Sequence, residues 1–166
     1  MNITLIGMPG CGKSTCGVLI AKMSCLSFLD IDLLIQQNEG MKLQEIINTK
    51  GYNYFANAEE QAIISLYTKN CVISTGGSAV YSEKAMNYLK SCSTIVYLKI
   101  DYNTMKNRIK NINTRGILLK ENQTLLDMYN EREALYQKYA DITIPIDEND
   151  PIDSVVGRVL SKINKM

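Results

Sequence analysis

The chain has 166 residues, and its 18 lysines and arginines nearly balance its 17 aspartates and glutamates, which leaves a formal net charge of +1. Such a surface offers no field of one sign to attract nucleic acid or anionic lipid, so neither is an expected partner. The sequence contains no histidine, which excludes imidazole catalysis and histidine metal ligands. A chain of this length can bury one full core, so we expect residues 1–166 to form a single domain.

The cysteines indicate a reducing compartment. There are five, an odd number, and they form no C-x-x-C pair. The apolar run at residues 2–6 is too short for the core of a signal peptide, and no run approaches membrane-spanning length. We therefore expect a cytoplasmic protein that has no membrane partner, and we expect it to be a monomer.

Residues 7–15 read GMPGCGKST and match the phosphate-binding loop pattern G-x-x-x-x-G-K-[ST]. They follow an apolar run and precede a helical one, as that pattern requires. Glycines let successive backbone N–H groups turn toward an anion, Lys13 adds a positive charge, and the Ser14 hydroxyl can ligate Mg²⁺. The alternative is a glycine-rich turn that only caps a helix. We expect the nucleotide to be bound by Gly10, Cys11, Gly12, Lys13, Ser14 and Thr15.

Short apolar runs and longer segments of helical period alternate along the chain. Strands are expected at residues 2–6, 26–29, 71–74, 94–100 and 142–144. Helices are expected at residues 13–24, 33–37, 41–49, 52–69, 82–89, 101–109 and 124–139, and after Pro151. This alternation predicts an α/β fold with three layers, in which helices cover both faces of a five-stranded parallel sheet.

Residues 110–122 interrupt this alternation with a polar, aperiodic segment, which is typical of a mobile lid over a site. Arg115 within it can bring positive charge to a phosphate and help to exclude water. Arg108 lies shortly before the segment, where its planar guanidinium can stack on adenine. Arg132 follows on the next helix. Taken alone, Arg132 is better explained by a surface ion pair worth less than about 1 kcal/mol.

Polar or glycine-rich residues follow three of the expected strands, at residues 7–14, 30–32 and 75–78. The carboxyl ends of parallel strands share one edge of the sheet, so these segments should meet in one crevice. Of Asp30 and Asp32, one can reach the Mg²⁺ sphere while the other orients an attacking hydroxyl. The alternative is that they are only helix N-caps, a role that Asp32 ahead of Leu33 would suit.

Six segments together resemble shikimate kinase in order and spacing, and they span essentially the whole chain. They are the loop at residues 7–15, Asp30-Ile31-Asp32, Gly51-x-x-x-Phe55-x-x-x-Glu59, Ser74-Thr75-Gly76-Gly77, Arg115-Gly116-Ile117-Leu118-Leu119 and Arg132-Glu133-Ala134-Leu135-Tyr136. The resemblance implies a nucleoside-monophosphate-kinase-like fold with the sheet order 2-3-1-4-5. It also implies a lid at about residues 110–122 and substrate-binding helices at about residues 32–69.

The same resemblance implies a reaction and assigns the residues that carry it. The ATP γ-phosphate would pass to the 3-hydroxyl of shikimate, a small-molecule acceptor, in aromatic amino-acid biosynthesis. The implied roles are Lys13 and Arg115 on the phosphates, Ser14 and Asp30 on Mg²⁺, Asp32 on the substrate hydroxyls, Gly76, Gly77 and Arg132 in the substrate pocket, and Arg108 at adenine.

The chain departs from the family pattern mostly at the acceptor end. Ala56 stands where the family has an arginine that grips the shikimate carboxylate, and Ser78 replaces the third of three glycines. Tyr52 replaces a glutamate, and Gly116 replaces a proline in the lid. Two alternatives therefore remain: a sibling kinase with another hydroxylated acceptor, and a nucleotide-binding protein without catalysis. The retained Lys13 argues against the second.

Overall fold

The computed structural model describes residues 1–109, 119–120 and 122–165. In the described residues the strands are β1 (Ile3–Ile6), β2 (Ser27–Asp30), β3 (Cys71–Ser74), β4 (Thr94–Lys99) and β5 (Ile142–Pro145). All neighbouring strands are parallel, and their order in the sheet is β2-β3-β1-β4-β5. The expected sheet and its order are therefore confirmed.

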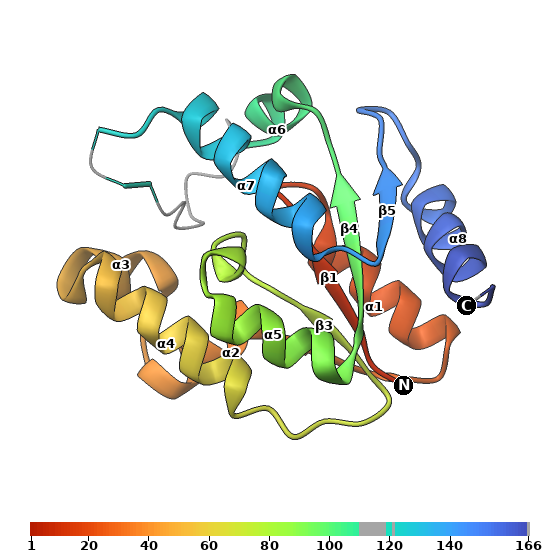
Figure 1. Ribbon diagram of the computed structural model, residues 1–166, viewed down its shortest axis with the longest axis horizontal. Helices are drawn as coiled ribbons and strands as arrows, with labels where there is room; N and C mark the ends of the chain where they lie inside the picture. The colour runs from red at the N-terminus through yellow and green to blue at the C-terminus, as the bar shows by residue number, and fades with distance from the viewer. Residues whose placement is uncertain (110–118, 121, 166) are drawn as a thin grey trace.

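The helices that the described residues form are α1 (Lys13–Met23), α2 (Ile31–Glu39), α3 (Leu43–Lys50), α4 (Tyr52–Ile64), α5 (Glu83–Cys92), α6 (Tyr102–Ile109), α7 (Leu125–Tyr139) and α8 (Ile152–Ile163). A short 3-10 helix, η1 (Ala79–Tyr81), lies between β3 and α5 and was not expected from the sequence. On one face of the sheet α1 packs against α8, and α5 and α7 cover the other face (Figure 1). Beyond the β2 edge, α2, α3 and α4 pack on one another.

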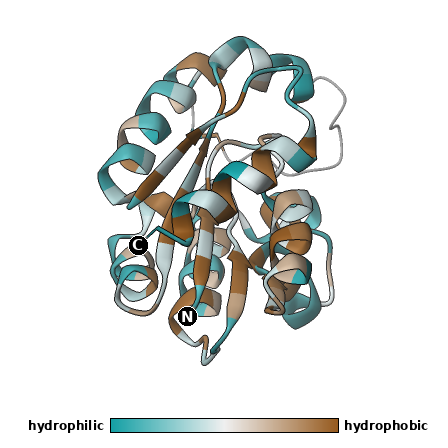
Figure 2. Cartoon of the chain, turned by 90° about the vertical axis from the view of Figure 1, so that its right-hand side faces the viewer, coloured by the Kyte–Doolittle hydropathy of each residue, from teal (hydrophilic) through white to brown (hydrophobic). Residues whose placement is uncertain are grey.

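The core is built on the three central strands. Every residue of β1 and β3 is buried, as is common where helices cover both faces of a parallel sheet. The edge strands are more open: β2 has one exposed and three partly buried residues, and Ile144 is the one buried residue of β5. Figure 2 shows the same arrangement, with hydrophobic strands inside and hydrophilic stretches on the outer helices. In the part of the chain that the structure describes, no helix is both long and apolar enough to cross a membrane.

One expected helix was too long. Residues 52–69 show helical spacing of apolar residues, but α4 ends at Ile64, and the Ser65 N–H bonds back to the Gln61 carbonyl. Tyr67, which continued the apolar period, is 91% exposed. The apolar spacing therefore continues past the residue at which the helix ends.

The register of the strands determines which loops lie together at the edge of the sheet. Ser74 at the end of β3 pairs with Asp30 at the end of β2 on one side and with Leu5 of β1 on the other. The loop after β1, the Asp30 segment and the turn after β3 consequently leave the same edge of the sheet. This confirms the expectation that three segments distant in sequence converge at one edge.

Candidate active site

The loop after β1 presents the amino end of α1 to the crevice. Gly10 (φ 78°) and Gly12 (φ 92°) adopt left-handed backbone conformations that favour glycine, and Gly12 is the N-cap of α1. No side chain caps this helix end. Its first N–H groups and the positive end of the helix dipole therefore suit an anion such as a phosphate.

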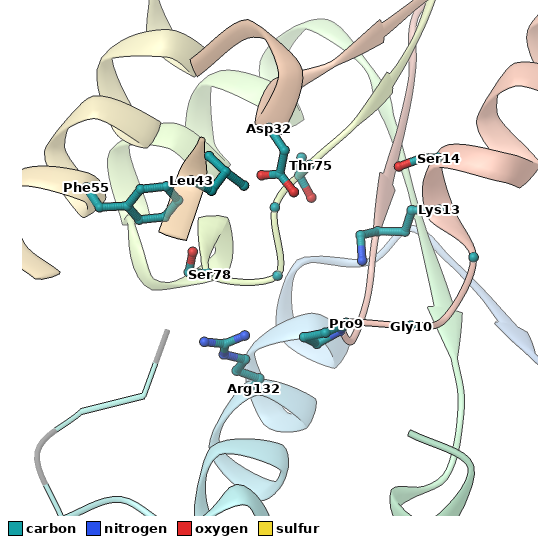
Figure 3. Close-up of a pocket in the computed structure, with 13 residues that line it drawn as sticks. Pro9, Gly10, Lys13, Ser14, Asp32, Leu43, Phe55, Thr75, Ser78 and Arg132 are labelled. Carbon is teal, nitrogen blue, oxygen red and sulfur yellow. The ribbon is translucent and has the colours of Figure 1, made fainter. Parts of the chain in front are cut away.

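Lys13 is buried at this loop, with 9% of its surface exposed. Its Nζ donates hydrogen bonds to the carbonyl oxygens of Gly7 at 2.8 Å and Met8 at 3.0 Å. In Figure 3 its side chain extends into the space that Asp32 enters from the opposite side. The ammonium group therefore lies within the crevice, close to the helix end that favours an anion.

Asp30 connects the loop to the end of β2. Its Oδ2 accepts a hydrogen bond from Ser14 Oγ at 2.6 Å, and its Oδ1 accepts the N–H groups of Asp32 and Leu33 at 3.0 and 3.3 Å. Asp30 is thus the N-cap of α2, and the suggestion that Asp32 has that role is wrong. Ser14 and Asp30 place two oxygen donors side by side, the ligand type that Mg²⁺ takes. Among the described residues, no group of three or more Cys, Asp or Glu side chains is placed to hold a metal ion.

Three of the expected nucleotide residues lie at the border of the crevice. Cys11 is 2% exposed and its N–H donates to the Met8 carbonyl at 3.2 Å, while Thr15 is exposed on α1. Arg108 donates to the Gly10 carbonyl at 3.2 Å and to the Glu148 carbonyl at 3.0 Å. The guanidinium therefore crosses the outside of the loop, and contact between Arg108 and adenine stays a prediction.

The turn after β3 passes close to side chains from three helices, and its two glycines leave room for them. A Cβ on Gly76 would lie 2.2 Å from Glu59 Oε1 and 2.8 Å from Asp32 Oδ1. A Cβ on Gly77 would lie 3.0 Å from Arg132 Nη1. Any larger residue at position 76 would displace two carboxyl groups, which explains the glycine at that position by close packing.

Arg132 is buried on α7 with 1% of its surface exposed, so its interpretation as a surface ion pair is wrong. Its Nε donates to the Tyr81 hydroxyl at 3.3 Å, and its guanidinium carbon lies 5.2 Å from the centre of the Tyr81 ring. Figure 3 shows the side chain entering the pocket from the side opposite Asp32. A planar cation held in this way suits a carboxylate.

Three residues at the site were not assigned a role from the sequence. Glu59 on α4 is 3% exposed, and Ser78 Oγ donates to its Oε2 at 2.6 Å. The Tyr136 hydroxyl donates to the Gly77 carbonyl at 2.7 Å, and burial raises the pKa of this tyrosine, which keeps it a donor. Glu59 and Tyr136 stand in the segments that carry the family resemblance, so the signal was present although their contacts were not foreseeable.

One pocket unites most of the predicted residues (Figure 3). Its lining consists of Pro9, Gly10, Gly12, Lys13, Ser14, Asp32, Leu43, Phe55, Thr75, Gly76, Gly77, Ser78 and Arg132. Cys11, Thr15, Asp30 and Arg108 are not part of that lining. Arg115 and most of the expected lid at residues 110–122 lie outside the described residues. The pocket therefore extends from the amino end of α1 to Asp32 and Arg132.

Comparison with known proteins shows the family. A family model described as shikimate kinase matches residues 9–164. The chain belongs to the shikimate kinase family. Shikimate kinase from Sulfurihydrogenibium sp. (strain YO3AOP1) is 34% identical over 165 residues, which are 99% of this chain and 98% of the relative. The enzyme from Aquifex aeolicus (strain VF5) is 34% identical over 161 residues, 96% of this chain and 94% of the relative.

Solved structures of shikimate kinases agree with this assignment. The structure of shikimate kinase from Acinetobacter baumannii in complex with shikimate has a TM-score of 0.90 at 28% identity and covers 99% of this chain and 93% of its own. The structure of shikimate kinase from Aquifex aeolicus has a TM-score of 0.85 at 33% identity and covers 99% of this chain and 96% of its own. The likeness extends over 99% of this chain in both cases.

Two residues at which the resemblance implies other side chains lie near one buried carboxyl group. Ser78, where the resemblance implies a glycine, donates its hydroxyl to Glu59. Ala56, where it implies an arginine, is half-buried on α4 and lies three residues before Glu59, less than one helical turn away.

Proposed function

We propose that this protein is an ATP-dependent shikimate kinase, which transfers the γ-phosphate of ATP to the 3-hydroxyl of shikimate. The observation that carries the proposal is that Lys13, Asp32 and Arg132 line one pocket in a chain that matches shikimate kinases over its full length. A relative of very similar fold was solved in complex with shikimate. The pocket has a cationic, helix-end side that would suit phosphates and an arginine side that would suit an anionic acceptor.

On the nucleotide side, the loop and α1 would hold the phosphates through backbone N–H groups and the Lys13 ammonium. The adjacent oxygens of Ser14 and Asp30 fit Mg²⁺, which would supply positive charge against the phosphate oxygens. Because Asp30 also caps α2, its carboxylate has a fixed direction. Arg115 is proposed as a second cation on the phosphates, from its place in the family pattern alone.

On the acceptor side, Asp32 would accept a hydrogen bond from the attacking hydroxyl and orient it toward the phosphate. Arg132 would bind the acceptor carboxylate, held in direction by Tyr81. Gly76 and Gly77 would let the substrate approach the turn closely, and Tyr136 fixes the turn through the Gly77 carbonyl. The fold brings Asp32, Arg132 and the loop after β1 to one edge of the sheet, which supports these roles.

A coupled ADP-release assay with ATP and Mg²⁺ tests the proposal. The acceptor panel should include shikimate, other hydroxy acids, polyols and hydroxylated amino acids. We expect shikimate to give the highest kcat/KM, and chelation of Mg²⁺ to stop turnover. Higher turnover of another acceptor would indicate a sibling kinase, and nucleotide binding without turnover of any acceptor would contradict enzymatic function.

A further inference from the structure

Glu59 is a buried carboxyl group that stands just behind the pocket wall. Its Oε2 accepts one hydrogen bond, from Ser78 at 2.6 Å. Its Oε1 has no hydrogen-bond partner among the residues that the structure describes. The neighbours three and four positions away on its own helix are uncharged; they are Phe55, Ala56, Ala62 and Ile63. A carboxylate in this position would therefore be poorly compensated by its nearest surroundings.

Charged groups face Glu59 from three other elements. They are Asp32 from α2, Lys13 from the amino end of α1 and Arg132 from α7. The buried residues of α3, α5 and η1, which also pack on α4, are uncharged. The glycine turn lies between these groups, because position 76 touches both carboxyl groups and position 77 touches the guanidinium.

These surroundings act on Glu59 in opposite directions. Together they raise the pKa of Glu59 to about 7: burial, the largest cause, and the negative charge of Asp32 raise it, whereas the Ser78 hydrogen bond, Arg132 and Lys13 lower it. The carboxyl group is consequently neutral in mildly acidic solution and ionised in mildly alkaline solution. Arg132 therefore faces an uncharged Glu59 in mildly acidic solution and a negatively charged Glu59 in mildly alkaline solution.

We propose that Glu59 is a positioning residue that sets how strongly Arg132 attracts an anionic acceptor, with protonated Glu59 as the form competent to bind it. The inference rests on the proposed function, because it needs an acceptor with a carboxylate. Ionised Glu59 repels the acceptor's carboxylate through the glycine turn, and its negative charge also attracts the Arg132 guanidinium that the acceptor needs. Both effects are strong because the site has a low dielectric. Since Glu59 is not in the pocket lining, it acts through Arg132 and the turn.

The kinetic signature is a pH-dependent KM for the acceptor. With saturating ATP and Mg²⁺, we expect the wild-type KM for shikimate to rise about tenfold from about pH 6 to about pH 8, with little change in kcat, as for one ionisation that blocks binding. Glu59→Gln, which cannot ionise, should keep a low KM throughout this range. The KM for ATP should not follow this profile in either protein.

Glu60→Gln is the matched control. Glu60 is the next residue of α4 but accepts hydrogen bonds from Ser82 Oγ at 2.6 Å and Lys84 Nζ at 3.4 Å, away from the pocket. These hydrogen bonds hold the pKa of Glu60 below its usual value, so it does not titrate near neutrality. The variant should show the same rise of KM with pH as the wild type.

Ser78→Ala distinguishes a titrating role from a structural one. Removing the Ser78 hydroxyl removes a hydrogen bond that favours the ionised form, so the pKa of Glu59 should increase. The rise of KM should then shift to higher pH and keep its shape. A loss of packing alone would change KM at every pH and would not shift the midpoint.

Thermal unfolding gives a readout that needs no substrate. Because the folded-state pKa of Glu59 lies above its ordinary value of 4.5, the folded protein keeps a proton that the unfolded chain releases. Wild-type stability should therefore fall as the pH rises between these two values. The Tm of Glu59→Gln relative to the wild type should increase from about pH 5 to about pH 8, and that of Glu60→Gln should not.

The outcomes separate this inference from the proposed function. A wild type that phosphorylates shikimate with a KM independent of pH, or a Glu59→Gln variant that keeps the wild-type rise, would overturn the inference and leave the proposed function in place. A wild type that neither binds nor phosphorylates shikimate at about pH 6 would overturn both. The rising KM, its absence in Glu59→Gln and its shift in Ser78→Ala together support the inference.

Discussion

The two ends of the pocket are built in different ways. The nucleotide end comes from one continuous segment, in which two left-handed glycines and the first turn of α1 present backbone N–H groups and Lys13. The acceptor end comes from separate elements, which bring Asp32, Glu59 and Arg132 to the turn at Gly76 and Gly77. A local segment keeps its geometry as long as its own sequence is kept. A site assembled from distant side chains can change one member at a time, and Ala56 and Ser78, where the family resemblance implies an arginine and a glycine, lie near this end.

The largest expected effect is at the nucleotide end, with Lys13→Ala. Removing the ammonium should lower kcat by about 10²- to 10³-fold, because a preorganised electrostatic contact to the transferred phosphate is lost. The coupled ADP-release assay measures it. Lys22→Ala, in the last turn of the same helix, is the control and should keep wild-type activity. A folded Lys13→Ala variant with wild-type turnover would show that the loop lysine is not the essential cation.

Arg132→Lys tests the acceptor end. Lysine keeps the charge but loses the planar fork and the stacking on Tyr81, so the KM for shikimate should rise roughly ten- to hundredfold while the KM for ATP stays the same. Arg158→Lys is a control with a partly buried arginine on α8 that pairs with Asp150. Equal KM values for shikimate in Arg132→Lys and the wild type would exclude this guanidinium as the carboxylate site.

The contrast between a local segment and a site built from distant elements also explains which features the sequence could predict. The strand–helix alternation and the loop pattern are local, and they were sufficient for the five strands, the helices on both faces and the convergence at one edge. The environment of Arg132 was not predictable, because its burial depends on Tyr81, which lies 51 residues away in the chain. The same holds for Glu59 and Ser78, whose contact forms only when α4 packs beside the turn after β3.

Short-range errors had a different cause. Asp32 was considered as the cap of α2, but Asp30 has that role, since the helix begins two residues earlier than the apolar period suggested. The start of a helix depends on which side chain accepts hydrogen bonds from the free N–H groups, and two aspartates two residues apart are almost equivalent candidates in sequence. The predicted roles of Cys11, Thr15 and Arg108 stay predictions, as does that of Arg115.

Gly76→Ala tests whether the acceptor end is as tightly packed as its contacts indicate. The new Cβ would lie 2.2 Å from Glu59 Oε1, so we expect a loss of about 1–3 kcal/mol in the free energy of unfolding. Gly157→Ala is the matched control, because a Cβ there meets nothing within 4 Å and replaces a glycine inside α8. It should stabilise the protein by up to about 1 kcal/mol. Denaturant unfolding that gives both variants equal stability would contradict the close packing at Gly76.

The smallest expected effect comes from Ala56→Arg, which adds a cation to the acceptor end. An arginine at this half-buried position can pair with Glu59 three residues later on α4 and reach the acceptor carboxylate. The KM for shikimate should fall by up to about tenfold, or about 1.4 kcal/mol, and most above neutral pH, where Glu59 is ionised. Asn57→Arg places the same side chain at the next, exposed position and should leave this KM unchanged. If a folded Ala56→Arg variant has the wild-type KM at every pH, charge behind the turn does not limit acceptor binding, and the shape of the pocket around Leu43 and Phe55 becomes the better explanation for its selectivity.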